Sequence, residues 1–115
     1  MSCLFDALAL HLPRVSSPQL RQLLAQYELT DPVMPDGRRF SEVIAPVPLR
    51  SYHRWIAQPN SWGGAPEIAA FCRLLQVEVR VRVPGGQTVV FAPGEPLKPR
   101  AYLRLAWNGS HFSAA

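Results

Sequence analysis

Apolar residues recur at every third or fourth position in several segments of the first 75 residues, which is the spacing of one buried face of an α-helix, whereas residues 30–48 are interrupted by prolines. Pro13 ends the first apolar run and Pro66 opens the last one. Ser17 is placed as an N-cap, with Pro18 in the first helical position. The pattern predicts helices over residues 3–12, 17–27, 49–57 and 65–75, with one helical turn over 41–44.

From Val77 onward the apolar period changes to two, which is typical of strands with one buried face. Strands are predicted over residues 77–83, 88–92, 101–107 and 111–114, with turns at 84–86 and 108–109. Helices followed by hairpin-linked strands indicate the α+β class, with N-terminal helices packed on a small antiparallel sheet. No repeat or linker-like segment is visible, so we expect a single domain over residues 1–115.

The composition fits a folded domain with its own core, because 48% of the residues are hydrophobic and 17% are charged. Two cysteines, Cys3 and Cys72, are too few for a disulfide scaffold and indicate a reducing compartment. The apolar runs are shorter than the ~20 residues of a membrane span, so we expect no direct membrane insertion. The N-terminal apolar stretch is interrupted by Asp6 and follows no basic residue, which argues against a signal peptide.

The net charge of +4 raises the question of nucleic-acid binding, and eleven of the twelve basic residues are arginines. These residues are scattered, and no stripe of aromatic and basic side chains suited to stacking bases is visible. We therefore expect no nucleic-acid partner. A basic α+β domain that binds RNA stays an alternative, which a strong salt dependence of RNA affinity would reveal.

Cys3 and His111 form the best nucleophile–base pair in the sequence. Cys3 starts a predicted helix, where backbone N–H groups and the helix dipole favour a thiolate. His11 lies on the same helix about 12 Å away, and nothing places His53 near Cys3. His111 opens the last strand of the sheet on which the first helix should pack. Cys72 is expected to be a small buried hydrophobe, and zinc-ligand spacings are absent. From spacing alone, Cys3 and His111 could equally be a structural cysteine and a surface histidine.

Segments of the chain, taken in order, resemble the motifs of the ovarian-tumour (OTU) family of cysteine proteases. Residues 2–8 are similar to the segment in which the nucleophilic cysteine opens a helix. Residues 62–70 are similar to the family's aromatic-Gly-Gly turn and the helix after it, although by themselves they predict only a turn with its indole in the core. Residues 77–83 are similar to the next strand, and 111–113 to the terminal histidine-aromatic motif. The resemblance implies a small OTU-like, papain-related α+β domain.

The chain departs from the family pattern in ways that imply a subfamily. Typical members have an acidic or amide residue two positions after the histidine, where this chain has Ser113. They also have an Asp-Gly pair ahead of the cysteine, where it has Met1 and Ser2. A short domain with a histidine-aromatic-serine ending resembles the tymovirus-type polyprotein proteases, which also act as deubiquitinases and use a Cys/His dyad. Those enzymes have Gly-Pro-Pro in the flap before the histidine, whereas this chain has Trp-Asn-Gly at 107–109.

The resemblance implies a role for each residue of the candidate site. Cys3 would attack the carbonyl carbon and His111 would act first as base and then as acid, while the Cys3 backbone N–H would bind the oxyanion. Ser113 would orient His111 weakly at most. The residues implied to border a narrow substrate groove, as a flap, are Trp107, Asn108, Gly109 and Ser110. No cofactor and no metal are implied.

The resulting functional hypothesis is a viral cysteine endopeptidase that processes a replication polyprotein and removes ubiquitin from conjugates. The implied partners are ubiquitin and polyprotein cleavage junctions with small residues before the scissile bond. The expected location is the host cytoplasm, at membrane-associated viral replication complexes to which the rest of the polyprotein carries the domain. The alternative is a non-catalytic ubiquitin- or protein-binding module on the same fold, in which Cys3 is structural.

Overall fold

The computed structural model describes residues 3–115, so the expectations on Met1 and Ser2 lie outside the described residues. Within this range the helices precede the strands, as the hydrophobic pattern predicts, and the α+β class is confirmed. The elements are α1 (Cys3–Ala9), α2 (Ser17–Leu29), α3 (Phe40–Val43), α4 (Leu49–Ile56), α5 (Ala65–Leu75), β1 (Glu78–Arg82), β2 (Thr88–Phe91), β3 (Tyr102–Trp107) and β4 (Phe112–Ala114).

α1 is shorter than the apolar pattern predicts. It ends at Ala9 rather than at Leu12, and the chain turns at residues 10–11. The ring of His11 in this turn is hydrogen-bonded to the main-chain oxygen of Arg104 in β3 (Nε2–O 3.0 Å). A contact with the sheet therefore takes the place of a further helical turn.

The N-cap of α2 is Ser16, which corrects the expectation of Ser17. The Gln19 backbone N–H donates to the Ser16 Oγ (3.2 Å), and the Ser16 backbone N–H donates to the Gln19 Oε1 (2.9 Å). This reciprocal capping box satisfies two N–H groups at once and so fixes the start of the helix one residue earlier.

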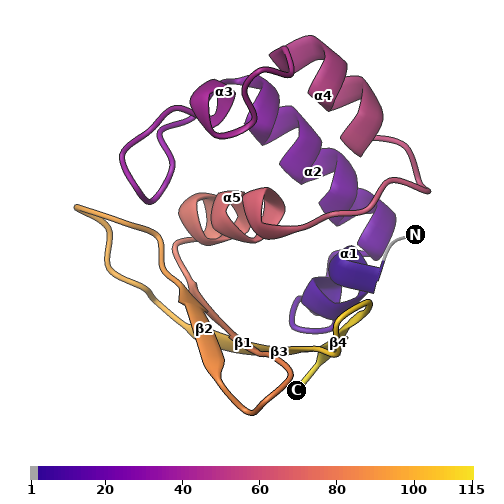
Figure 1. Ribbon diagram of the computed structural model, residues 1–115, viewed down its shortest axis with the longest axis vertical. Helices are drawn as coiled ribbons and strands as arrows, with labels where there is room; N and C mark the ends of the chain where they lie inside the picture. Colours follow the sequence, from indigo (N-terminus) through magenta and orange to yellow (C-terminus); the bar gives the residue numbers. More distant parts are fainter. Residues whose placement is uncertain (1–2) are drawn as a thin grey trace.

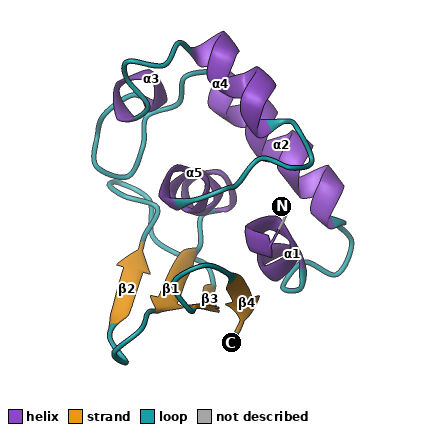
Figure 2. Cartoon of the chain, turned by 45° about the vertical axis from the view of Figure 1, so that its right-hand side comes forward, coloured by secondary structure: helices purple, strands orange, loops and turns teal. Residues whose placement is uncertain are grey.

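The helices lie on one face of the sheet in layers (Figure 1). α1 and α5 lie next to the sheet, and α2 and α4 pack on each other farther out (Figure 2). None of the described helices covers the other face of the sheet, and none of them is long and apolar enough to cross a membrane. The core fills the space between helices and sheet; its largest fully buried apolar side chains are Phe5, Phe40, Phe71, Leu4, Leu8, Leu20, Leu24, Met34, Ile56, Ile68 and Leu105.

The sheet is mixed, which corrects the expectation of an antiparallel sheet. Its strand order is β2-β1-β3-β4; the two outer pairs are antiparallel, but β1 and β3 are parallel. Val81 lies opposite Leu105 in the parallel pair, and both are buried under the helices. The alternation of apolar residues determines which face of a strand is buried and leaves its direction open. The segment 92–101 returns the chain to the start of β1, and this return makes the pair parallel.

The returning segment is held against α5 by one arginine. The Arg73 guanidinium donates to the carbonyl oxygens of residues 93, 94 and 95 (3.0, 3.3 and 3.1 Å). Gly94 has a φ of +84°, and a Cβ there would lie 2.5 Å from the Pro35 main chain. Only glycine permits this close approach, so the path of the segment is closely constrained.

Two glutamates are buried among the helices, Glu28 of α2 and Glu67 of α5, each 1% exposed. The Tyr52 hydroxyl of α4 donates to the Glu67 Oε2 (2.5 Å). Neither Glu28 oxygen has a donor among residues 3–115. Burial, and then the charge of Glu67, raise the pKa of Glu28, so Glu28 is protonated near neutral pH and donates to the Glu67 carboxylate. We call Glu28, Tyr52 and Glu67 the acid cluster.

Glu28→Gln should stabilise the fold above about pH 5. The pKa of Glu28 in the folded state lies above its unfolded value, so folding takes up a proton near neutral pH and the parent loses stability as the pH rises from the unfolded value towards the folded one. Glutamine cannot ionise and still donates an N–H to Glu67. We expect its advantage in unfolding free energy to grow by about 1.4 kcal/mol per pH unit between about pH 5 and pH 8, measured by urea denaturation.

Glu95→Gln, which removes an exposed carboxylate, is the matched control and should show no such pH-dependent gain. A difference between Glu28→Gln and the parent that is the same at both ends of the pH range would show that Glu28 is ionised in the folded protein.

Candidate active site

The start of α1 and the β3–β4 hairpin carry the two candidate catalytic residues. Cys3 is the first residue of α1 and is partly buried, whereas His111 directly precedes β4 and is exposed. α1 packs against β4, so the fold brings these two elements side by side (Figure 1). Among residues 3–115 no hydrogen bond joins the Cys3 sulfur to the His111 ring, a contact that in many enzymes forms only with substrate bound. Their pairing stays a prediction.

The turn before His111 is closed by the Asn108 side chain. Asn108 Oδ1 accepts hydrogen bonds from the Ser110 N–H (2.9 Å), the Ser110 hydroxyl (3.1 Å) and the His111 N–H (2.8 Å). Gly109 between them has a φ of +103°, which favours glycine. Trp107 lies opposite Phe112, so the loop comprises residues 108–111 and is longer than the tight turn expected at 108–109. Asn108 fixes the backbone of His111 in this loop, while the role of the loop as a substrate flap stays a prediction.

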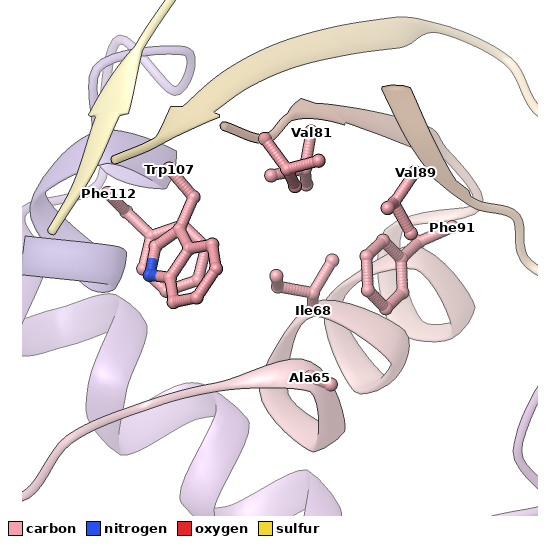
Figure 3. Close-up of a pocket in the computed structure, with 8 residues that line it drawn as sticks. Ala65, Ile68, Val81, Val89, Phe91, Trp107 and Phe112 are labelled. Atoms are coloured by element: carbon pink, nitrogen blue, oxygen red, sulfur yellow. The ribbon is translucent and has the colours of Figure 1, made fainter. Parts of the chain in front are cut away.

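The Trp107 ring lies in an apolar pocket between α5 and the sheet. Its ring and that of Phe112 are 6.3 Å apart between centroids and form one end of the pocket, facing Val89 and Phe91 at the other end (Figure 3). The pocket has a volume of about 200 Å³; its lining residues are Ala65, Ile68, Val81, Val83, Val89, Phe91, Trp107 and Phe112. Trp107 thus contributes to an apolar surface next to the hairpin rather than to the Asn108 turn.

Ser113 makes no visible contact with the candidate base. It is exposed and lies opposite Ala106 in the β3–β4 pair. Among residues 3–115 its hydroxyl forms no hydrogen bond, and neither does the His111 ring. The weak orienting role of Ser113 stays a prediction.

The ring of His111 is stacked on Trp62, a residue that was not expected in the site. The two ring centroids are 6.3 Å apart and the rings are inclined by 29°. The indole is 51% exposed, so the expectation that it fills the core is wrong. A Cβ on Gly63 would lie 2.9 Å from a Leu4 methyl carbon and 3.0 Å from the Phe5 ring, so glycine is needed for this turn to lie against α1. The segment thus touches both α1 and the His111 ring.

The segment before Trp62 is hydrogen-bonded to Arg21 of α2, whose side chain is buried (3% exposed). Its guanidinium donates to the carbonyl oxygens of Ile56 (2.8 Å), Pro59 (3.3 Å) and Ser61 (2.9 Å). The guanidinium carbon also lies 4.2 Å from the centroid of the Phe5 ring. Burial lowers the pKa of Arg21, but an arginine stays charged at any physiological pH.

The segment after Trp62 is held by the acid cluster. The Gly64 N–H donates to the Glu67 Oε1 (2.8 Å), which satisfies a free N–H at the start of α5. The contacts of Arg21 and of the acid cluster could have been expected from the sequence. Arg21 and Glu28 share the apolar face of α2 with Leu24, and a charged residue on such a face requires buried partners.

The other histidines and the second cysteine have structural contacts. The His53 Nδ1 lies 3.0 Å from the Ala25 main-chain oxygen, and His11 is bonded to β3 as described. Cys72 is buried, its thiol donates to the Phe91 carbonyl oxygen (3.4 Å), and burial raises the pKa of the thiol to about 12. Cys72 is therefore no candidate nucleophile. The described residues contain no group of three or more ligand-type side chains suited to a metal ion.

Two curated relatives match the chain along nearly its whole length. Ubiquitin thioesterase OTU1 of Dictyostelium discoideum is 30% identical over 98% of this chain and 34% of its own length. Ubiquitin thioesterase OTU1 of Saccharomyces cerevisiae is 35% identical over 98% of this chain and 36% of its own length. The chain thus spans about a third of the length of these relatives. No family model matches it.

Solved structures share the fold. An OTU domain in complex with ubiquitin superposes with a TM-score of 0.78 at 28% identity, over 98% of this chain and 62% of that one. The OTU domain of Hazara virus bound to ubiquitin superposes with a TM-score of 0.73 at 23% identity, over 98% of this chain and 73% of that one, which shows a shared fold alone. The sequence match and the common fold together place this chain in the OTU domain family.

Proposed function

We propose that this domain is a cysteine protease that cleaves bonds to the C-terminal carbonyl group of ubiquitin. The observation that carries the proposal is the packing of α1 on β4, which sets the helix that begins at Cys3 beside the strand that follows His111. The names of its relatives, ubiquitin thioesterases, and the ubiquitin bound to a similar OTU domain support the choice of substrate.

In the proposed reaction the His111 imidazole removes the thiol proton of Cys3, and the sulfur attacks the carbonyl carbon to form a tetrahedral oxyanion. The Cys3 backbone N–H, which has no intrahelical partner at the start of α1, donates to that oxyanion. As the carbon–nitrogen bond breaks, His111 gives its proton to the leaving amine and a thioester remains. A water molecule that loses a proton to His111 then attacks the thioester, which releases the carboxylate and restores the thiol.

Cleavage of a viral polyprotein in the host cytoplasm is a finer proposal. The fold shared with the Hazara virus domain is compatible with it, whereas the sequence relatives in Dictyostelium and yeast favour ubiquitin as the substrate. Hydrolysis of ubiquitin conjugates is therefore tested first, and peptides ending in small residues would test polyprotein cleavage.

Cys3→Ala should abolish both hydrolysis of ubiquitin fused to a fluorogenic amide and covalent capture by an electrophile at the ubiquitin C-terminus. The matched variant Cys72→Ala should keep nearly the parent rate and lose about 1–2 kcal/mol of stability, because it removes a buried thiol from the core. Capture that persists in Cys3→Ala would refute the proposed nucleophile. Ubiquitin binding without capture by the parent chain would favour the non-catalytic module.

Ser113→Ala should lower kcat less than about tenfold, whereas His111→Ala should abolish turnover. Loss of a true orienting residue of a catalytic triad costs about 10⁴ in rate, and within residues 3–115 the Ser113 hydroxyl forms no hydrogen bond that would carry such an effect. Steady-state kinetics on the same ubiquitin substrate measure both variants. Comparable losses in the two would identify Ser113 as a third member of the site.

Asn108→Ala should lower kcat about tenfold, because it removes the acceptor that fixes the backbone N–H of His111. Asn108→Asp keeps an acceptor oxygen in place and should retain most of the activity. Both variants should melt within a few degrees of the parent, since the turn is exposed. Equal activity of the alanine variant and the parent would show that the turn has no part in positioning His111.

A further inference from the structure

We propose that Trp62 is the positioning residue for the His111 imidazole, which it orients by stacking against one face of the ring. The inference rests on the proposed function for its effect on turnover, while the stacking itself can be tested without any activity. In typical family members the side chain two positions after the histidine orients its ring. Here a residue of the segment between α4 and α5 would orient it instead.

The ring of His111 needs such a restraint. Asn108 fixes the backbone N–H of His111 but leaves both side-chain torsions free, and the second torsion of histidine has a broad range. Within residues 3–115 the imidazole forms no hydrogen bond, and Ser113 offers none. Trp62 is the aromatic ring that stacks on it.

Trp62 is suited to this task because its own backbone is held on both sides. On one side the Ser61 carbonyl accepts from buried Arg21, and on the other the Gly64 N–H donates to buried Glu67. Gly63 between them lies against α1, where a Cβ would be too close. A side chain on such a segment presents its ring at a defined place, although the ring itself is half exposed.

The expected size of the effect follows from the geometry. Offset aromatic pairs with centroids 4.5–7 Å apart shift an equilibrium by roughly two- to tenfold beyond the area they bury. Stacking of this strength raises the fraction of His111 rings in the productive rotamer and leaves substrate affinity unchanged. Loss of the indole should therefore lower kcat by roughly three- to tenfold and leave KM within about twofold of the parent.

Direct binding of substrate by Trp62 is the competing explanation, because about half of its surface is open to solvent. The two explanations differ in kinetics, since removal of a group that binds substrate raises KM, whereas removal of a group that only positions the base lowers kcat. They also differ in the absence of substrate, where only positioning requires the two rings to be stacked.

The experiment compares Trp62→Leu and Trp62→Phe with the parent chain. The ring-proton NMR signals of His111, assigned by comparison with His111→Asn, report stacking through the ring current of the neighbouring indole. Turnover of ubiquitin fused to a fluorogenic amide reports kcat and KM. Trp55→Leu is the matched control, because Trp55 is similarly exposed (47%) but its ring contacts Tyr52 in α4 at an inclination of 60°, away from the hairpin.

We expect the His111 signals to shift in Trp62→Leu and to stay in place in Trp55→Leu, with kcat lowered only in the former and largely restored in Trp62→Phe. Unchanged His111 signals in Trp62→Leu, or a raised KM at constant kcat, would overturn the inference. An inactive parent would refute the proposed function alone, because the NMR signals still show whether Trp62 holds the ring.

Discussion

The buried guanidinium of Arg21 is the group on which the arrangement of the site depends. A charged side chain that is 3% exposed requires acceptors for its N–H groups, and Arg21 finds them in the main chain between α4 and α5. The carbonyl oxygens of residues 56, 59 and 61 reach one guanidinium only because the segment curls around it. The segment that carries Trp62 thus takes its shape from a side chain of α2, which also packs on Phe5 of α1.

The acid cluster gives the same segment its second fixed end. Two carboxyl groups are buried together at acceptable cost only if one of them is neutral, and protonation of Glu28 lets the pair share a proton. Glu67 then accepts from Tyr52 and Gly64 as well, and its charge interacts favourably with Arg21. Polar groups of α2, α4 and α5 form one connected network in this way, and this network holds the start of α5 where the segment ends.

The order of the elements and most of their bounds are predictable from the sequence, because the burial of one face is a local property of each segment. Strand direction is not local: β3 pairs parallel with β1 because Arg73 and the segment 92–101 determine where β3 begins. For the site, the family motifs locate Cys3 and His111 in the sequence, and the fold places their elements side by side. Trp62 is missed because an indole is expected in the core, whereas its position depends on Arg21, which lies forty-one residues earlier.

The two restraints on His111 come from different halves of the chain, and neither replaces the other. Asn108 belongs to the hairpin of the sheet and acts on the backbone, while Trp62 belongs to the helical half and acts on the ring. Gly63 lies against Leu4 and Phe5, so the packing that positions Trp62 also positions the helix that begins at Cys3. Docking of the helical half on β4 therefore brings the candidate nucleophile and the support for the candidate base into place in one step. The site is therefore complete only where the helical half is packed on the sheet, because its nucleophile, its base and the support of the base come from both halves.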